Sequence, residues 1–213
     1  MNIENFRNKL IVFESPDHSG KTTITPLLTN YLNNNGIPTI ATKQPGDLNY
    51  GGHAEIMHSL AKDKKHNLDP LTGLFVFLAD RSENTSKIIE PALIKGFSVV
   101  CDRYWYSTIA YQFFGKQLLE KYNLNIEFAE WMNKVASHSV EPDIVFYFNR
   151  PDELIKTTID NQNDTFETES DKFKQRVKKA YLMMCEKYKF NIINVDPDPQ
   201  ITLERILNYD EKI

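Results

Sequence analysis

The sequence predicts an α/β fold in which a five-stranded parallel sheet has helices on both of its faces. Short apolar runs alternate along the chain with longer amphipathic stretches, and strands that alternate with helices build βαβ units with parallel strands. The apolar runs are continuous and lack the polar alternation of a half-exposed strand. Such runs are typical of strands that helices bury on both sides.

The first part of the chain shows this alternation clearly. Leu10–Phe13 (LIVF) is uninterrupted by polar residues and predicts a buried strand. Lys21–Asn33 follows as a helix, and Gly36 closes it because glycine readily adopts the left-handed conformation found after helix ends. Thr39–Thr42 predicts the second strand.

The remaining sequence continues the pattern to a fifth strand and a last helix. We expect a bend or break at Pro91, because proline cannot donate a helical hydrogen bond. In parallel sheets ligands bind beyond the carboxyl ends of the strands, so the chemistry should lie in the loops after Phe13, Thr42, Cys101 and Phe148. The further strands are expected at 97–101, 144–148 and 191–195, and the further helices at 71–94, 118–137, 171–189 and 201–207.

The composition fits a globular protein that concentrates positive charge locally. Its 213 residues suit one domain, 1–213, and a net charge of -4 leaves no general footprint for nucleic acid or membranes. No apolar stretch reaches the length of a membrane span, and Met1–Lys9 lacks the apolar core of a secretion signal. Cys101 and Cys185 are isolated, which argues against a zinc site and fits a reducing compartment. We therefore expect a cytoplasmic protein with neither a nucleic-acid nor a membrane partner.

A phosphate-binding loop is expected directly after the first strand. Residues 15–22 read S-P-D-H-S-G-K-T, which matches the pattern G-x-x-x-x-G-K-[ST] except for Ser15 at the first glycine. In such a loop backbone N–H groups cradle nucleotide phosphates, the lysine reaches the outer phosphates and the next hydroxyl holds Mg²⁺. Short GK[ST] strings also occur by chance at the start of helices. The position of this one between a predicted strand and a predicted helix favours a phosphate-binding role. Because serine lacks the backbone freedom of glycine, we expect a slightly reshaped loop. The residues expected to bind ATP phosphates are His18, Ser19, Gly20, Lys21, Thr22 and Thr23.

An acidic and a basic residue follow the third strand at the same edge of the expected sheet. A carboxylate at Asp102 suits Mg²⁺, directly or through water, and the guanidinium of Arg103 suits a phosphate. An ordinary strand end with a capping aspartate would look similar, but the preceding GKT string favours the functional interpretation. Four neighbours mix polar and aromatic side chains in a way that suits a base and a sugar: Ser107, Thr108, Tyr111 and Gln112.

At this point the chain resembles a known family. Residues 102–112 (DRYWYSTIAYQ) closely resemble the thymidylate kinase signature D-R-Y-x-x-S-T-x-A-Y-Q. Residues 42–46 resemble the family's T-R-E-P-G loop, 77–81 its L-F-x-A-x-R segment, and 142–143 its P-D-L strand entry. The resemblance spans essentially the whole chain. It implies a P-loop NTPase fold, a homodimer, and Mg²⁺-dependent transfer of a phosphoryl group from ATP to dTMP.

The resemblance also implies roles for individual residues. Phe77 would stack on thymine, although core packing is a serious rival role for an aromatic residue. Arg81 would bond the base edge or the phosphate, and Tyr111 would press against C2′ of the sugar. Lys21, Arg103 and Asp17 would carry catalysis. The implied dTMP-binding residues are Asp17, Phe77, Arg81, Arg103, Ser107, Thr108, Tyr111 and Gln112, and the implied metal-binding residues are Thr22 and Asp102.

Three features depart from the family pattern. Ser15 replaces a glycine, and Lys43–Gln44 replaces an Arg-Glu pair, which keeps a positive charge but loses bidentate geometry. The third is the lid expected near 151–170, where no arginine occurs between Pro151 and Gln175. Because an arginine at the transferred phosphoryl group is worth about three to five decades in rate, a substitute is needed or the enzyme is slow or altered in substrate. Candidate substitutes are Lys156, His18 and Arg150.

Other functions and surfaces remain open from the sequence. The chain could phosphorylate another deoxynucleoside monophosphate, or a deoxynucleoside with Glu14 as general base. It could also be a catalytically weak nucleotide-binding paralogue, which the missing lid arginine and Ser15 motivate. A dimer could use the apolar segments Phe75–Leu78 or Phe113–Phe114, which core burial explains equally well.

Overall fold

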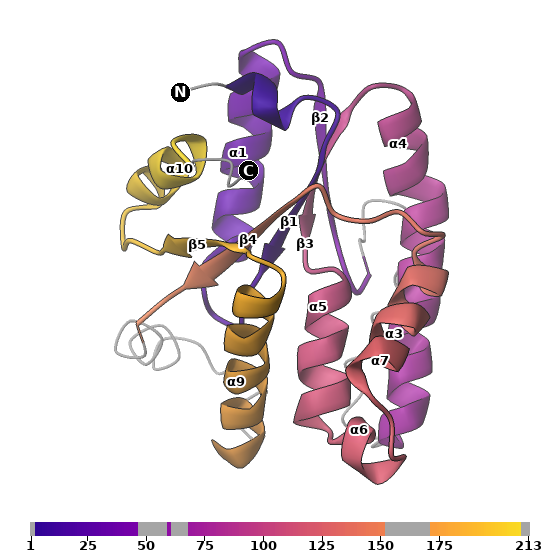
Figure 1. Ribbon diagram of the computed structural model, residues 1–213. Coiled ribbons are helices and arrows are strands. Elements are labelled where there is room, and N and C mark those ends of the chain that lie inside the picture. The colour runs from indigo at the N-terminus through magenta and orange to yellow at the C-terminus, as the bar shows by residue number, and fades with distance from the viewer. Residues whose placement is uncertain (1–2, 47–58, 61–67, 152–170, 210–213) are drawn as a thin grey trace.

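Five parallel strands form the centre of the structure, in the order β2-β3-β1-β4-β5 (Figure 1). The computed structural model describes residues 3–46, 59–60, 68–151 and 171–209. Every described strand pair is parallel, so the predicted sheet is confirmed. The strands are β1 (Leu10–Glu14), β2 (Thr39–Lys43), β3 (Ser98–Asp102), β4 (Ile144–Asn149) and β5 (Asn191–Asn194).

Helices cover both faces of this sheet, as the sequence predicts. In Figure 1, α1 and α10 lie on one face, and α3, α4, α5, α7 and α9 lie on the other. The α-helices are α1 (Lys21–Asn34), α3 (Pro70–Asn84), α4 (Glu90–Ile94), α5 (Trp105–Thr108), α6 (Leu118–Lys121), α7 (Ile126–Ala136), α9 (Asp171–Lys187) and α10 (Pro199–Leu207); the others are the 3-10 turn η1 (Ile3–Phe6) and the π-helical turns η3 (Thr85–Ile89) and η4 (Ile109–Gly115).

Two apolar cores, one on each face, explain why the strands read as continuous hydrophobic runs. In β1, Leu10 and Val12 point into the core beneath α3, α5 and α9, whereas Ile11 and Phe13 point into the core beneath α1 and α10. All four side chains have 0% exposure. Because successive strand residues face opposite sides, a strand covered on both faces has no polar position.

The expected helix at 118–137 is wrong as a single element. The structure has two helices, α6 and α7, with a break at 122–125. Asn125 accepts a hydrogen bond from the backbone N–H of Phe128 at 2.9 Å and so caps the start of α7. The expected helix at 71–94 is confirmed as a continuous run, α3 to α4, in which Pro91 lies in the first turn of α4 after the π-helical turn.

The helical run Trp105–Gly115 is not anticipated by the sequence reading. It consists of α5 and the π-helical turn η4, and it begins directly after the Asp102-Arg103 pair. This run carries four of the residues expected to bind substrate, which are Ser107, Thr108, Tyr111 and Gln112. Their one-turn spacing therefore decides which of them face the same way.

The expected lid is a different case. Of the segment 151–170, only Pro151 belongs to the described part of the chain, and Lys156 lies outside it.

Candidate active site

The loop after β1 has the backbone of a phosphate cradle. It leaves the sheet at Ser15 and enters α1 at Lys21, with Gly20 at the N-cap. Gly20 has φ +90° and His18 has φ +61°, both in the left-handed region that favours glycine. Ser15 is not among the described non-glycine residues with positive φ. A side chain at Ser15 therefore strains no backbone, and the sequence expectation of a reshaped loop has no steric cause there.

The ammonium group of Lys21 is held inside this loop. Its Nζ donates to Ser15 Oγ at 2.6 Å, to Ser19 Oγ at 3.1 Å and to the carbonyl oxygen of Pro16 at 3.0 Å. The residue is only 5% exposed. Burial, reinforced by the charge of Arg103, lowers the pKa of Lys21 to about 8. The serine that replaces the first glycine of the motif thus supplies the nearest hydrogen-bond partner of the lysine.

Thr22 and Asp102 meet at the mouth of the loop. The hydroxyl of Thr22 donates to Asp102 Oδ2 at 3.3 Å. Asp102 Oδ1 is buried and has no hydrogen-bond partner among the described residues. A hydroxyl and a carboxylate with an unused oxygen form a donor set that fits Mg²⁺, which binds few protein oxygens and shares phosphates and waters. The described residues hold no cluster of three His, Cys, Asp or Glu that could bind a metal ion alone.

Arg103 joins the loop after β3 to the P-loop. Its Nη1 donates to the carbonyl oxygen of Ser15 at 2.9 Å and to Ser107 Oγ at 3.0 Å. It also lies 3.4 Å from the hydroxyl of Tyr181 on α9. The backbone of Arg103 has φ +72°, an unfavourable conformation for a non-glycine residue. Strain of this kind persists where surrounding contacts fix a residue, and it gathers at functional sites.

Asp17 completes this cluster on the P-loop side. Its Oδ1 accepts from Arg103 Nη2 at 2.5 Å, and its Oδ2 accepts from the hydroxyl of Tyr111 at 2.9 Å. The guanidinium of Arg103 lies over the ring of Tyr111, 5.1 Å from its centroid. Burial alone would raise the pKa of Asp17, but the charges of Arg103 and Lys21 outweigh it and lower that pKa. The three residues implied to be catalytic therefore lie in one electrostatic unit with Tyr111.

Glu14, the last residue of β1, ties three elements together beneath the site. Its Oε1 accepts from the backbone N–H groups of Tyr104 at 2.9 Å and Ser107 at 3.1 Å. Its Oε2 accepts from Ser107 Oγ at 2.6 Å and from the Tyr181 hydroxyl at 2.9 Å. The residue has 0% exposure. A fully buried carboxylate that accepts from four donors has no capacity for a substrate hydroxyl, so the general-base role considered for Glu14 is not supported.

Arg81 lies in a buried polar cluster behind the expected base pocket. Its Nε donates to Gln44 Oε1 at 3.0 Å, its Nη1 to Thr108 Oγ1 at 2.9 Å and to Asn133 Oδ1, and its Nη2 to the carbonyl oxygen of Tyr104 at 2.7 Å. Arg81 is 2% exposed, and burial lowers its pKa. All four of these acceptors are uncharged, so the contact between Arg81 and Gln44 is a hydrogen bond to a neutral amide.

Gln44 and Asn84 connect this hydrogen-bond network to β2. Its Nε2 donates to Asn84 Oδ1 at 3.1 Å, and Asn84 Nδ2 donates to Thr42 Oγ1 at 2.9 Å. The backbone N–H of Gly46 donates to Asp80 Oδ1 at 2.8 Å, so the loop after β2 is fixed to α3 at two places.

The remaining residues implied to bind substrate are distributed over α3 and the run Trp105–Gly115. Phe77 is half-buried and belongs to neither apolar core, which weakens the alternative that it is a core residue. Thr108 is 3% exposed and Gln112 is 8% exposed, so their side chains face inward. The structure brings Ser107 and Tyr111 into direct contact with the Arg103 cluster, whereas Thr108 contacts Arg81.

Arg150 reaches the P-loop from the other side. It follows β4, and its Nη1 donates to the carbonyl oxygen of His18 at 2.5 Å. Of the three residues considered as replacements for the missing lid arginine, His18 and Arg150 thus contact each other.

Sequence reasoning missed several residues that hold this site. Tyr181 reads as one apolar position of an amphipathic helix, and Asn133 as an ordinary polar residue of α7. Both are fully buried. A tyrosine or asparagine on the apolar stripe of a helix is a usable signal, because a buried hydroxyl or amide requires a partner.

Comparisons with known proteins identify relatives over almost the full length of the chain. The family model described as thymidylate kinase matches residues 13–206. A thymidylate kinase of Oleidesulfovibrio alaskensis is 33% identical over 210 residues, covering 92% of this chain and 94% of the relative. One from Thermosipho africanus is 32% identical over 177 residues, covering 83% and 84%. The crystal structure of thymidylate kinase from Ehrlichia chaffeensis superimposes with a TM-score of 0.72 at 26% identity, covering 93% and 96% of the two chains.

Proposed function

The chain belongs to the thymidylate kinase family, and we propose how its residues carry out the reaction of that family. It catalyses the ATP-dependent phosphorylation of dTMP to dTDP, on the P-loop NTPase fold that the sequence predicts. We propose that residues 1–213 form one kinase domain, which the match of the family model over 13–206 supports.

The P-loop binds the phosphates of ATP. Its backbone N–H groups and the N-terminus of α1 present positive dipole ends to the anion, and Lys21 reaches the outer phosphates. The left-handed backbone at His18 and Gly20 supports this assignment, since it turns successive N–H groups toward one concave side. The residues assigned to ATP phosphates are His18, Ser19, Gly20, Lys21, Thr22 and Thr23.

Thr22 and Asp102 hold Mg²⁺ when ATP is bound. The unused buried oxygen of Asp102 supports this role. A metal ion held there would supply positive charge that neutralises phosphate oxygens. The two side chains lie 3.3 Å apart, close enough to contribute to one site.

The observation that carries the substrate assignment is the unit of Asp17, Arg103 and Tyr111. Arg103 stands between the P-loop and the expected sugar site, with its guanidinium turned by Asp17 and stacked on Tyr111. A planar guanidinium so placed can bind the dTMP phosphate through two hydrogen bonds and align it with the ATP γ-phosphate. Tyr111 then faces the sugar, and Asp17 the 3′-hydroxyl. The acceptor phosphate is its own nucleophile, so no strong general base is needed.

The base pocket is assigned to α3 and the start of the helical run after β3. Phe77 stacks on thymine, and Arg81, one helical turn later, holds Thr108 in place through the hydrogen bond at 2.9 Å. Thr108 and Gln112 line the polar side, and Ser107 supports Arg103. Arg81 is 2% exposed and already donates to four acceptors, so we assign it the role of orienting Thr108 and not that of a direct contact with the base.

A nucleotide panel tests this proposal. With MgATP, we expect ADP release with dTMP and at most slow release with dUMP, dGMP, dAMP, dCMP, UMP or thymidine. Chelation of Mg²⁺ should abolish the reaction. Fast turnover of another monophosphate would show that Thr108, Gln112 and Arg81 select a base other than thymine. ATP binding without any turnover would favour the alternative of a non-catalytic nucleotide-binding protein.

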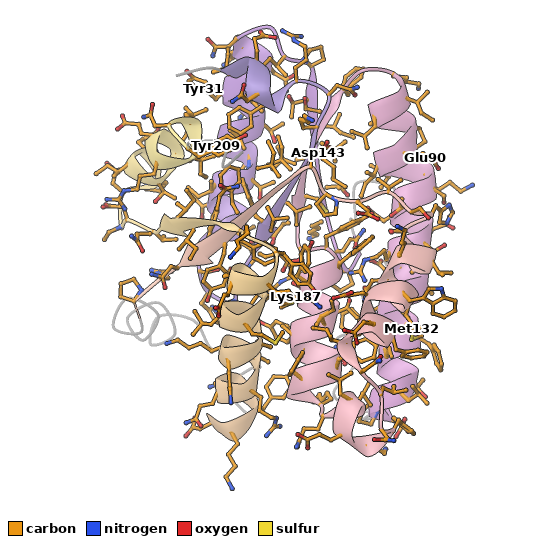
Figure 2. All side chains as sticks on the ribbon, in the orientation of Figure 1. Tyr31, Glu90, Met132, Asp143, Lys187 and Tyr209 are labelled. Atoms are coloured by element: carbon orange, nitrogen blue, oxygen red, sulfur yellow. The ribbon has the colours of Figure 1, made fainter. Side chains whose placement is uncertain are left out.

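We propose that the protein is a homodimer paired through α3 and α7, which lie side by side; Met132, labelled in Figure 2, marks α7. Large apolar side chains are exposed there: Phe75 at 53%, Trp131 at 60% and Val135 at 57%. Exposed aromatic residues on neighbouring helices favour a protein interface. The sequence alternative at Phe113–Phe114 is wrong for Phe113, which has 0% exposure in the core.

Trp131→Glu should convert the dimer to a monomer, because it places a charge within the proposed interface. Ile192→Glu, at an apolar residue of similar exposure (53%, against 60% for Trp131) on the outer strand β5, should leave the mass unchanged. Light scattering after size exclusion measures both. A wild-type monomer, or a dimer that survives Trp131→Glu, would exclude this interface.

The cellular location and the absence of a nucleic-acid partner are inferred from general properties of the chain. None of the helices in the described ranges is long and apolar enough to cross a bilayer. We propose a cytoplasmic location and no nucleic-acid partner, which the net charge of -4 and the two free cysteines support.

A further inference from the structure

Two arginines flank the P-loop, one from each neighbouring strand. In the sheet β1 lies between β3 and β4, and the P-loop follows β1. Arg103 follows β3 and donates to the carbonyl oxygen of Ser15 at 2.9 Å, at the start of the loop. Arg150 follows β4 and donates to the carbonyl oxygen of His18 at 2.5 Å, at its middle. The carboxyl edge of the sheet thus places positive charge on both sides of the phosphate site.

The two arginines contact different parts of the site. Arg103 is fixed by Asp17, by Ser107 and by the ring of Tyr111, all on the side assigned to dTMP. Arg150 contacts His18, whose backbone belongs to the cradle for ATP phosphates. Lys21 lies between them, inside the loop. Arg150 is therefore the arginine in the described part of the chain that contacts the middle of the P-loop.

Phosphoryl transfer requires positive charge near the phosphate oxygens of ATP. The bond from the γ-phosphorus to the bridging oxygen of ATP breaks, ADP leaves with that electron pair, and a bond forms to an oxygen of the dTMP phosphate. Negative charge shifts toward the bridging oxygen and spreads over the transferred group, and a guanidinium at these oxygens stabilises it. The P-loop contains no arginine, and neither does the sequence from 151 to 175.

We propose that Arg150 is the catalytic arginine of this enzyme. Its guanidinium exchanges the neutral carbonyl oxygen of His18 for oxygens of the ATP β- and γ-phosphates, and it binds them most strongly when charge develops during transfer. Hydrogen bonds to charged oxygens are shorter and about twice as strong as those to neutral ones, which favours the phosphate oxygens over this carbonyl. The inference rests on the proposed function, since it concerns the same ATP site.

Steady-state kinetics of Arg150→Ala and Arg150→Lys with MgATP and dTMP test the proposal. We expect kcat to fall about a thousandfold in Arg150→Ala, with KM for dTMP little changed because Arg103 binds the acceptor. Arg150→Lys should recover only part of the loss, since lysine lacks the planar fork. Guanidinium ion added to Arg150→Ala should restore activity in a saturable way, which a purely structural defect would not allow.

Arg7→Ala is the matched control. Arg7 also donates to a backbone carbonyl, that of Gly36 at 3.3 Å, but it precedes β1 at the amino end of the strand. We expect wild-type kinetics and a wild-type melting temperature from it.

The possible results distinguish the proposed role of Arg150 from the kinase activity on which it rests. Wild-type protein that fails to phosphorylate dTMP would remove the proposed function itself. Active wild type with an Arg150→Ala variant within about tenfold of it in kcat would overturn the role of Arg150 alone. A larger loss in Lys156→Ala or His18→Ala than in Arg150→Ala would likewise overturn it and assign the charge to that residue. An Arg150→Ala loss without guanidinium rescue, accompanied by a lowered melting temperature, would reduce Arg150 to a structural partner of His18.

Discussion

Lys21→Met should abolish most activity, with kcat/KM for ATP lower by about a thousandfold or more. Lys21 is the one lysine of the phosphate loop, and its ammonium group lies within 3.1 Å of both loop serines. This charge lies inside the loop that we assign to the ATP phosphates. Methionine fills a similar volume without the charge, so the fold should persist while the phosphates lose their closest cation. ADP release in a coupled assay and circular dichroism measure the two effects.

Lys9→Met is the matched control for that substitution. Lys9 directly precedes β1 and pairs with Asp143, labelled in Figure 2 at the amino end of β4, at 3.1 Å. Exposed pairs of this kind contribute about 1 kcal/mol or less. The control changes net charge equally, and we expect unchanged kinetics. Activity of Lys21→Met within tenfold of wild type would show that the loop does not use its lysine for ATP.

Glu14→Ala should lower the free energy of unfolding by about 4 kcal/mol. The carboxylate is fully buried and accepts from Tyr104 N–H, from the N–H and Oγ of Ser107, and from the Tyr181 hydroxyl. Alanine leaves all of these donors without their acceptor in a space that excludes water. Glu14→Gln retains one acceptor oxygen and should cost about half as much. Urea denaturation followed by fluorescence measures both.

Glu141→Ala serves as the comparison for this second prediction. Glu141 pairs with Lys134 on the surface at 2.6 Å, with side chains 54% and 52% exposed, so its loss should cost less than about 1 kcal/mol. If Glu14→Ala unfolds no more easily than Glu141→Ala, the carboxylate does not hold β1, α5 and α9 together. Retained stability combined with lost activity would instead reopen a catalytic role for Glu14.

The architecture was readable from the sequence because it depends on local periodicity. The run Leu10–Phe13 is apolar at every position, and this pattern requires cover on both faces, as the two cores beneath and above β1 provide. The parallel direction of the strands and the placement of the loops at one edge follow from the same alternation, whereas the strand order does not. The helical run Trp105–Gly115 was missed because its first turn depends on Glu14, a residue about 90 positions away in the chain. Local propensity carries no information about such a partner.

The candidate site could be predicted from the sequence only in part, because some of its contacts also depend on distant residues. Motif spacing indicates which side chains reach the carboxyl edge, and Arg103 and Asp17 indeed meet there. Motif spacing does not indicate which acceptors surround a buried group. The partners of Arg81 come from the loop after β2, from α5 and from α7, and Tyr181 comes from α9. Only the packing of the helices on the sheet decides these contacts. The break at 122–125 likewise depends on the cap at Asn125, which the hydrophobic pattern of α7 does not require.

The serine at the first position of the phosphate loop changes how nucleotide affinity should be understood. Ser15 and Ser19 both accept hydrogen bonds from the ammonium group of Lys21. ATP must therefore compete with the protein's own hydroxyl groups for one ammonium ion. The free energy of ATP binding is then a difference between two hydrogen-bonded states of Lys21, and a loop with glycine at that position would give the lysine one acceptor fewer. We therefore expect Ser15 to weaken ATP binding through its hydrogen bond to Lys21, without a contact to the nucleotide.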